Sequence, residues 1–296
     1  MTGLGGIFVD ILGPVLLIVA IGAVAGRWLG VPAPPLAKLS FWVIGPAFVF
    51  DSLASAGLAS GALGRMAAAS AIAFAASAAV AGLLSIGLPR DRRAAVITTG
   101  AYGNVGNFGL AIVTFTFDAE ARPFAAIALV VVNGLGLVLA VVSAKGGWSG
   151  VLQALRSPMT LVIPPALLVN GFDVDLPTVA DRSIGLLAGA IIPVMLISLG
   201  IQLQEIGWPR VDLDVARSLV AKLVVQPLVA IPIVAAIGLS DVAGGAVVLQ
   251  AAMPAAVFTA VIALELDARP DETAVIVMAG TLLSVLTLPW FILYVT

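Results

Sequence analysis

The chain has 296 residues, of which 61% are apolar and 10% are charged, and its mean hydropathy is +1.18. Soluble domains contain about 45–50% apolar and about 25% charged residues, so this composition excludes a water-soluble globular fold and predicts an integral membrane protein. The net charge of −2 gives no basis for binding nucleic acid, and the absence of Cys and His excludes disulfides, thiolate chemistry and imidazole metal sites.

Ten stretches are long and apolar enough to cross a bilayer, since a spanning helix needs about 20 mostly apolar residues. They are residues 7–27, 36–56, 62–87, 94–117, 121–144, 151–170, 180–203, 213–238, 243–264 and 272–294. The first has no Lys or Arg before Arg27, which indicates a retained span rather than a cleaved signal peptide. The expected fold is an all-α integral membrane protein with ten transmembrane helices and short loops.

Basic residues predict the orientation of these spans, because Lys and Arg are concentrated in cytoplasmic loops. Odd-numbered loops hold ten of the 14 basic residues, even-numbered loops hold three, and Lys222 lies inside the eighth span. We therefore expect a multi-pass protein of the cell (inner or plasma) membrane with both termini on the extracytoplasmic side.

Short motifs recur in the two halves of the chain at a nearly constant offset. The Ile-Gly-Leu of 86–88 returns at 237–239, which is 151 residues later, and the Ala-Arg-Pro of 121–123 returns at 268–270, which is 147 residues later. Each half contains five spans, an odd number, so the second half must enter the membrane from the opposite side. We predict two inverted five-helix repeats, over residues 1–145 and 150–296.

The fourth predicted span contains glycine at every third position from Gly100 to Gly109, with Asn104 and Asn107 between them. Each glycine costs about 1 kcal/mol in a helix relative to alanine, and unwound backbone at membrane depth is tolerated only where it lines protein or a water-filled cavity. The pattern favours a discontinuous helix. The alternative is close packing of small residues, with the two amides bonded across helices.

The ninth predicted span is interrupted at the matching place by Pro254, which removes a backbone hydrogen bond and clashes with the preceding turn. Alone, it could be a simple proline kink. Two interrupted helices at corresponding positions of inverted halves instead indicate a transport site. We expect helices four and nine to cross there.

The half-helix ends predict the chemistry of such a site. N-terminal ends carry a partial positive charge and free N–H groups that hold a carboxylate, whereas C-terminal ends offer carbonyls suited to a cation or a proton carrier. Asn133, in span five, is either part of this site or engaged in an interhelical amide bond. The residues expected to line the site are Asn104, Gly106, Asn107, Asn133, Pro254 and Thr259.

Charged residues inside the predicted spans are further candidates. Lys222 lies four residues before Gln226, on the same helix face, where both could contribute to the site. Lys222 could attract an anion or pair with Glu265, or its side chain could snorkel to the headgroups. Asp51, near the outer end of span two, is interpreted as a capped interfacial acid rather than a proton site. No metal or cofactor site is expected.

Three segments resemble the auxin efflux carrier family of membrane transporters. They are the motif Gly103-Asn104-x-Gly106-Asn107-x-Gly109 and residues 195–203 and 281–289. The resemblance implies a scaffold of spans one, two, six and seven, and a core of spans three to five and eight to ten, with spans four and nine crossing at the substrate site. The related bile acid sodium symporters share this arrangement, but their sodium-site residues have no convincing counterparts here. The chain also has Leu110-Ala111 after Gly109, where a proline often follows in the family.

The expected function is a secondary transporter that moves a small organic anion, such as a malonate-like dicarboxylate or an auxin-like acid, by an elevator-like or rocking movement. The alternatives are a sodium-coupled carrier similar to bile acid symporters, a channel or sensor, and an integral-membrane enzyme. An enzyme is disfavoured because the acidic clusters have no convincing ligand spacing. The expected partners are the anion and the lipid bilayer but no nucleic acid; coupling to protons or sodium and assembly as a homodimer are left open.

Overall fold

A computed structural model describes residues 3–56, 60–144, 149–205, 212–239, 241–266 and 268–296, and these residues form helices with no β-strand among them. The prediction of an all-α protein is confirmed. In chain order the helices, with η for π and 3-10 turns, are α1 (Leu4–Gly6), η1 (Ile7–Leu12), α2 (Gly13–Leu29), α3 (Ala33–Leu39), η2 (Ser40–Ile44), α4 (Gly45–Ala54), α5 (Ser60–Leu84), α6 (Arg90–Ala101), η3 (Val105–Gly109), α7 (Leu110–Phe117), η4 (Asp118–Ala121), α8 (Arg122–Ala144), α9 (Ser149–Leu155), α10 (Pro158–Leu161), α11 (Ile163–Gly171), α12 (Thr178–Gly189), α13 (Ile191–Glu205), α14 (Leu213–Leu219), η5 (Val220–Val225), α15 (Gln226–Ile237), α16 (Asp241–Ala252), α17 (Phe258–Leu266) and α18 (Pro270–Val295).

Seven helical stretches of the described residues are long and apolar enough to cross a membrane. The pair Ser149–Leu155 and Pro158–Gly171, bent by 52°, would make an eighth. The number falls below ten because both predicted breaks divide a span, and because α7 continues through η4 into α8 as one stretch, Val105–Ala144. The chain is a multi-pass membrane protein, whereas its ten spans and inverted repeat stay predictions.

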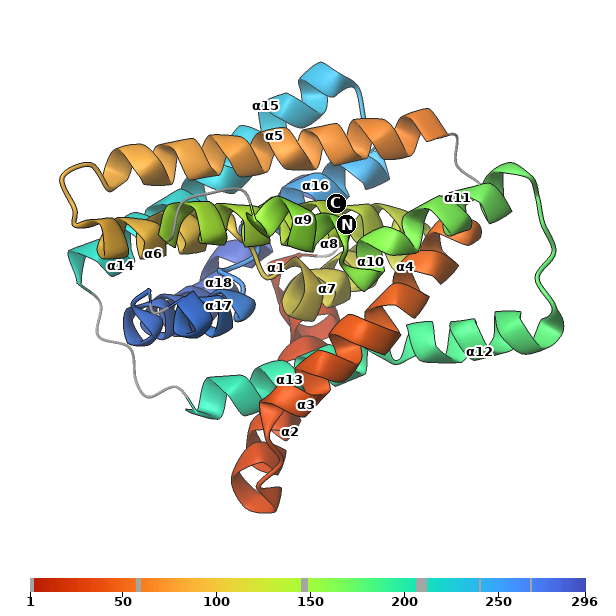
Figure 1. Ribbon diagram of the computed structural model, residues 1–296, viewed down its shortest axis with the longest axis horizontal. Helices are drawn as coiled ribbons and strands as arrows, with labels where there is room; N and C mark the ends of the chain where they lie inside the picture. The colour runs from red at the N-terminus through yellow and green to blue at the C-terminus, as the bar shows by residue number, and fades with distance from the viewer. Residues whose placement is uncertain (1–2, 57–59, 145–148, 206–211, 240, 267) are drawn as a thin grey trace.

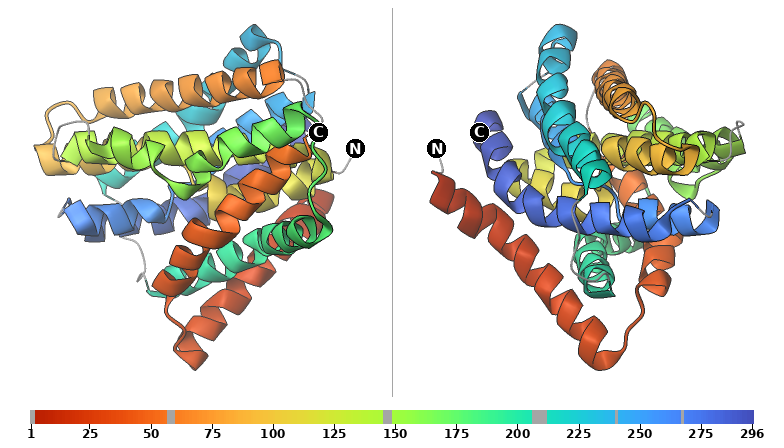
Figure 2. Two further views of the ribbon diagram at one scale, coloured as in Figure 1. Left: turned by 45° about the vertical axis from the view of Figure 1, so that its right-hand side comes forward. Right: turned by 90° about the vertical axis from the view of Figure 1, so that its left-hand side faces the viewer.

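The helices pack in two groups. The α2–α13 group contains α2, α3, α4, α11, α12 and α13: α2 lies along α13, and α4 contacts α11 and α12. The α5–α18 group contains α5 to α8 and α14 to α18: α5 packs on α6, α8 and α15, and α18 packs on α16 and α17. In Figure 1, α2, α3, α12 and α13 lie along the lower side, and α5 and α15 lie along the upper side. Figure 2 shows α2 at the outer edge of the helical bundle.

Two glycines bring α2 and α13 into close contact. A Cβ placed on Gly22 would lie 2.8 Å from the Cα of Ile197, and one placed on Gly200 would lie 2.7 Å from the backbone N of Ala23. A backbone can approach the facing helix this closely only where the residue at the contact is glycine, the usual role of small residues in membrane helix pairs. The α2–α13 contact therefore depends on glycine at both positions.

Three π turns each come directly before a proline that stays inside a continuous helix. η1, η2 and η5 precede Pro14, Pro46 and Pro227, in each case with one residue between the turn and the proline. Proline has no N–H and its ring clashes with the carbonyl four residues earlier, and the wider turn of a π-helix absorbs that conflict. The helix continues, and residues inside the turn change their phase relative to those after it.

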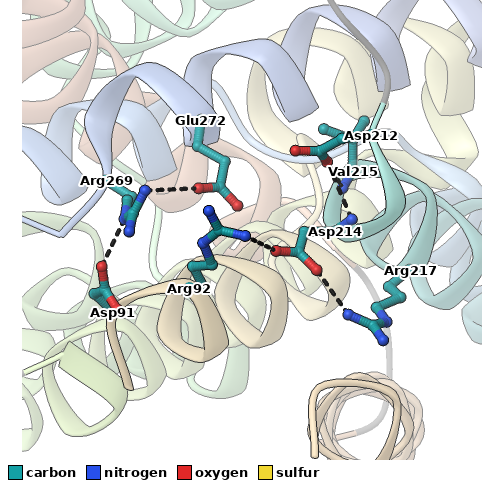
Figure 3. Close-up of polar contacts among 8 residues, drawn as sticks. All are labelled: Asp91, Arg92, Asp212, Asp214, Val215, Arg217, Arg269 and Glu272. Atoms are coloured by element: carbon teal, nitrogen blue, oxygen red, sulfur yellow. Dashed lines mark hydrogen bonds and ion pairs between the residues drawn. The ribbon is translucent and has the colours of Figure 1, made fainter. Parts of the chain in front are cut away.

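A charged cluster joins the ends of α6, α14 and α18 (Figure 3). Asp214, only 4% exposed, accepts hydrogen bonds from Arg92 at 3.3 Å and from Arg217 at 2.7 Å. Arg269 donates to Asp91 at 2.6 Å, and its guanidinium lies 3.8 Å from the carboxylate of Glu272. This hydrogen bond lowers the pKa of Asp91, so the Asp91–Arg269 pair is fully formed at neutral pH and is lost only as the pH falls below the ordinary carboxylate range.

Asp214→Ala should lower the stability of the folded protein by about 1–3 kcal/mol, because it leaves Arg92 and Arg217 without their shared buried acceptor. The thermal unfolding midpoint of the detergent-purified protein measures the loss. Asp91→Ala is the matched control, since that carboxylate is well exposed and exposed ion pairs contribute little. Equal midpoint shifts in the two variants would show that the burial of Asp214 is unimportant.

Candidate functional site

Two helices are interrupted where the sequence indicates. The first break separates the end of α6 at Ala101 from the start of η3 at Val105, and the second separates the end of α16 at Ala252 from the start of α17 at Phe258. The backbone of the two breaks pairs directly: Asn104 N donates to Pro254 O at 2.7 Å, and Ala256 N donates to Tyr102 O at 2.8 Å. Gly103 and Ala255 form an isolated antiparallel bridge. We call residues 102–104 and 253–257 the crossing.

Carbonyls at the C-terminal ends of α6 and α16 accept hydrogen bonds from side chains of neighbouring helices. The ammonium of Lys222 donates to Ala251 O at 2.7 Å and to the side-chain oxygen of Gln226. The Gln226 amide nitrogen donates in turn to Ala101 O at 3.3 Å. In addition, Ser77 Oγ donates to Gly100 O at 2.7 Å. Carbonyls that have no partner within their own half-helix are thus satisfied by side chains.

Lys222 does not snorkel, because its side chain is only 1% exposed and is bonded inside the protein. The predicted proximity of Lys222 and Gln226 on one helix face is confirmed by their hydrogen bond. The suggested pairing with Glu265 is wrong: Glu265 is exposed, and the hydrogen bonds of Lys222 go to Gln226 and Ala251.

Asn104 directly precedes η3, which begins the second half of the first broken helix. This side chain is 3% exposed, and its Nδ2 has no hydrogen-bond partner among the described residues. Gly106 and Asn107 follow in the first turn of η3, where backbone N–H groups have no partner within the helix. Gly106 is buried and Asn107 is half-buried. The Asn104 amide and the free backbone N–H groups at the start of η3 are donors at a positive helix end, which is an environment suited to an anion.

The remaining predicted residues lie near the crossing with partners of their own. Thr259 is buried at the start of α17, and its hydroxyl donates to Ala256 O at 2.6 Å. Pro254 contributes its carbonyl to the backbone of Asn104. Asn133 accepts a hydrogen bond from the hydroxyl of Tyr102 at 3.0 Å, which is the interhelical amide bond that the sequence left open. A role for these three residues in binding stays a prediction.

Gln250 is an additional polar residue at the crossing that the sequence-based site does not contain. It is 3% exposed, and neither its amide nitrogen nor its amide oxygen has a partner among the described residues. A Cβ on Gly109 would overlap the side-chain oxygen of Gln250, so the carboxamide lies against the second half of the first broken helix. The signal in the sequence is a lone amide in the apolar helix α16, which is costly without a polar function.

A small cavity of about 20 Å³ lies between α6, α8, α17 and the start of α18. Three threonines, Thr98, Thr259 and Thr273, are among the residues that line it, and the buried Thr273 hydroxyl has no hydrogen-bond partner in the described part of the chain. This volume admits about one water molecule, which is too little for an organic anion. A substrate could reach the crossing from this side only if the helices around it moved apart.

Comparison with known proteins finds similarity to membrane transport proteins. Residues 148–292 match the family described as membrane transport protein, and the matched range contains Lys222, Gln250 and Pro254 but not Asn104. An uncharacterized transporter of Methanothermobacter thermautotrophicus is 29% identical over 158 residues, which make up 53% of this chain and 52% of that relative. The chain thus covers about half the length of the curated relative that it matches.

Proposed function

We propose that the chain is a secondary transporter of the auxin efflux carrier family and that it carries a small organic anion by alternating access; its similarity to membrane transport proteins supports this. In this proposal the protein acts as a transporter rather than as an enzyme. The observation that carries the anion proposal is the crossing, where the buried Asn104 side chain, at the start of a half-helix, has a donor with no partner among the residues that the structure describes. Donors without acceptors at a positive helix end favour a ligand that brings acceptors, and a carboxylate does so.

The two packing groups support a division of labour between a scaffold and a moving core. In this proposal the α2–α13 group is the scaffold and the α5–α18 group, which contains both broken helices, is the core. The protein would lie in the cell membrane with both termini extracytoplasmic. Movement of the core against the scaffold would expose the crossing alternately to the two sides.

An ion pair between the groups supports a closed outer side in this conformation. Asp51, on α4, lies 2.9 Å from the guanidinium of Arg122, at the start of α8. The same guanidinium lies 5.7 Å from the centre of the Phe48 ring. The end of α4 and the start of α8, where these residues lie, both belong to the side that the basic residues predict to be extracytoplasmic. This pairing agrees with the interpretation of Asp51 as a capped acid, and it would have to break when the outer side opens.

Asn104→Ala and Asn107→Ala should each reduce uptake of labelled malonate or indole-3-acetate into proteoliposomes by about tenfold or more, because a hydrogen bond to a charged ligand contributes about 1.5–3 kcal/mol. Asn170→Ala is the matched control: the side chain of this asparagine donates to Leu53 O at 2.9 Å within the α2–α13 group, whereas the proposed ligand contacts belong to the α5–α18 group. Wild-type uptake by both test variants would show that the proposed site is wrong.

A further inference from the structure

The C-terminal ends of two half-helices face the same small region of the protein. α6 ends at Ala101 and α16 ends at Ala252, and the backbones that follow them pair at the crossing. Each of these ends carries a partial negative charge and carbonyls that the helix itself cannot satisfy. In carriers with broken helices, such ends commonly coordinate a cation that accompanies the substrate.

In this chain a lysine side chain reaches that region. The ammonium of Lys222 donates directly to the carbonyl of Ala251 and reaches the carbonyl of Ala101 through Gln226. Among the described residues, no carboxylate lies within ion-pair distance of this ammonium. Its positive charge is therefore balanced by the two helix ends and by the Gln226 oxygen.

The backbone is shaped around the ammonium. A Cβ on Gly103 would lie 2.9 Å from both Cε and Nζ of Lys222, so a residue with a side chain at position 103 would displace the lysine. The π turn η5 (Val220–Val225) contains Lys222, and Gln226 follows it directly. Glycine in one break and a widened turn in the neighbouring helix together create the space that this side chain fills.

We propose that the Lys222 ammonium is the built-in cation of the crossing: it takes the position that a bound monovalent cation would otherwise occupy, and the carrier needs no sodium. This inference rests on the proposed transport function only where it concerns flux. The consequence for stability, that removing the ammonium leaves a site for a small cation, holds whatever the protein carries.

The first test measures the thermal unfolding of purified Lys222→Ala in chlorides of sodium, lithium, potassium and ammonium, with choline chloride at equal ionic strength as the reference. Wild type should unfold at the same temperature in all five salts. Lys222→Ala should unfold at a lower temperature in choline and recover at least half of the loss in one of the small cations, because a ligand of the folded state raises its stability. Lys38→Ala, which removes an exposed lysine, should show no such dependence.

Two results would overturn the proposal: Lys222→Ala as stable as wild type in choline, or an equal loss in every salt. If that variant fails to fold, Lys222→Met, which keeps most of the apolar part of the side chain but removes the ammonium, undergoes the same measurement. A third arm compares uptake by wild-type proteoliposomes in sodium and in choline, where rates within about twofold are expected. Stimulation by sodium of tenfold or more would contradict the built-in cation. Absence of any uptake would count against the transport function, and the unfolding temperatures in the five salts would then test the built-in cation alone.

Discussion

Covalent linkage of position 51 to position 122 should reduce uptake to below about one tenth of the unlinked rate, because alternating access requires the outer side to open. Asp51 and Arg122 lie in contact on α4 and α8, one in each packing group. The chain contains no cysteine, so Asp51→Cys and Arg122→Cys introduce its only thiols. A short bifunctional thiol reagent that is cleaved by reduction would link them, and uptake would be measured before linkage, after linkage and after reduction.

The matched control links two positions within one group. Asp91 and Arg269 lie 2.6 Å apart at the ends of α6 and α18, both in the α5–α18 group. The pair Asp91→Cys and Arg269→Cys, linked by the same reagent, should keep the uptake of the unlinked protein. A 51–122 linkage without effect would mean that the groups do not separate during transport, as in a passive channel.

Gly200→Leu should destabilise the protein by about 3 kcal/mol or more and lower its unfolding midpoint by about 5–10 °C. The new side chain would occupy space held by the backbone of α2, since even a Cβ there would overlap the carbonyl of Val19. Neither backbone can yield without separating α2 from α13, so the loss is larger than that of an ordinary overpacked core position.

Gly185→Leu provides the control, because a Cβ on this glycine of α12 would have no atom within 4 Å. It makes the same chemical change in the neighbouring helix and should leave the midpoint unchanged or raise it slightly, since leucine favours a helix over glycine. Similar midpoints for Gly185→Leu and Gly200→Leu would refute the dependence of the α2–α13 contact on glycine.

Residues with a strong local effect on the backbone could be interpreted from the sequence. The glycines around Asn104 and the single Pro254 predict two interrupted helices. In the structure the helices are interrupted at residues 102–104 and 253–257. Glycine weakens a helix and proline breaks its hydrogen bonding wherever they occur, so these signals do not depend on distant contacts. Proline alone is ambiguous, however, since Pro14, Pro46 and Pro227 follow π turns and leave their helices continuous.

Features that arise from packing could not be predicted in this way. The spacing of Lys222 and Gln226 predicts that they share a helix face, but not that they reach the carbonyls of Ala251 and Ala101 on two other helices. The contact of Arg92 with Asp214 joins residues 122 positions apart. Such contacts depend on how helices assemble, and short-range patterns carry no information about that.

The π turn η5 also determines what can be learned about Lys222 from related proteins. A π turn contains one residue more than an α turn, so it rotates the residues on one side of it by about 100° relative to those on the other. A relative that lacks this extra residue, and keeps a lysine in the aligned column, would direct that lysine to a different face of the helix. Conversely, a lysine one column away could reach the same half-helix ends. Alignment columns in this helix are therefore comparable only between proteins that share the insertion.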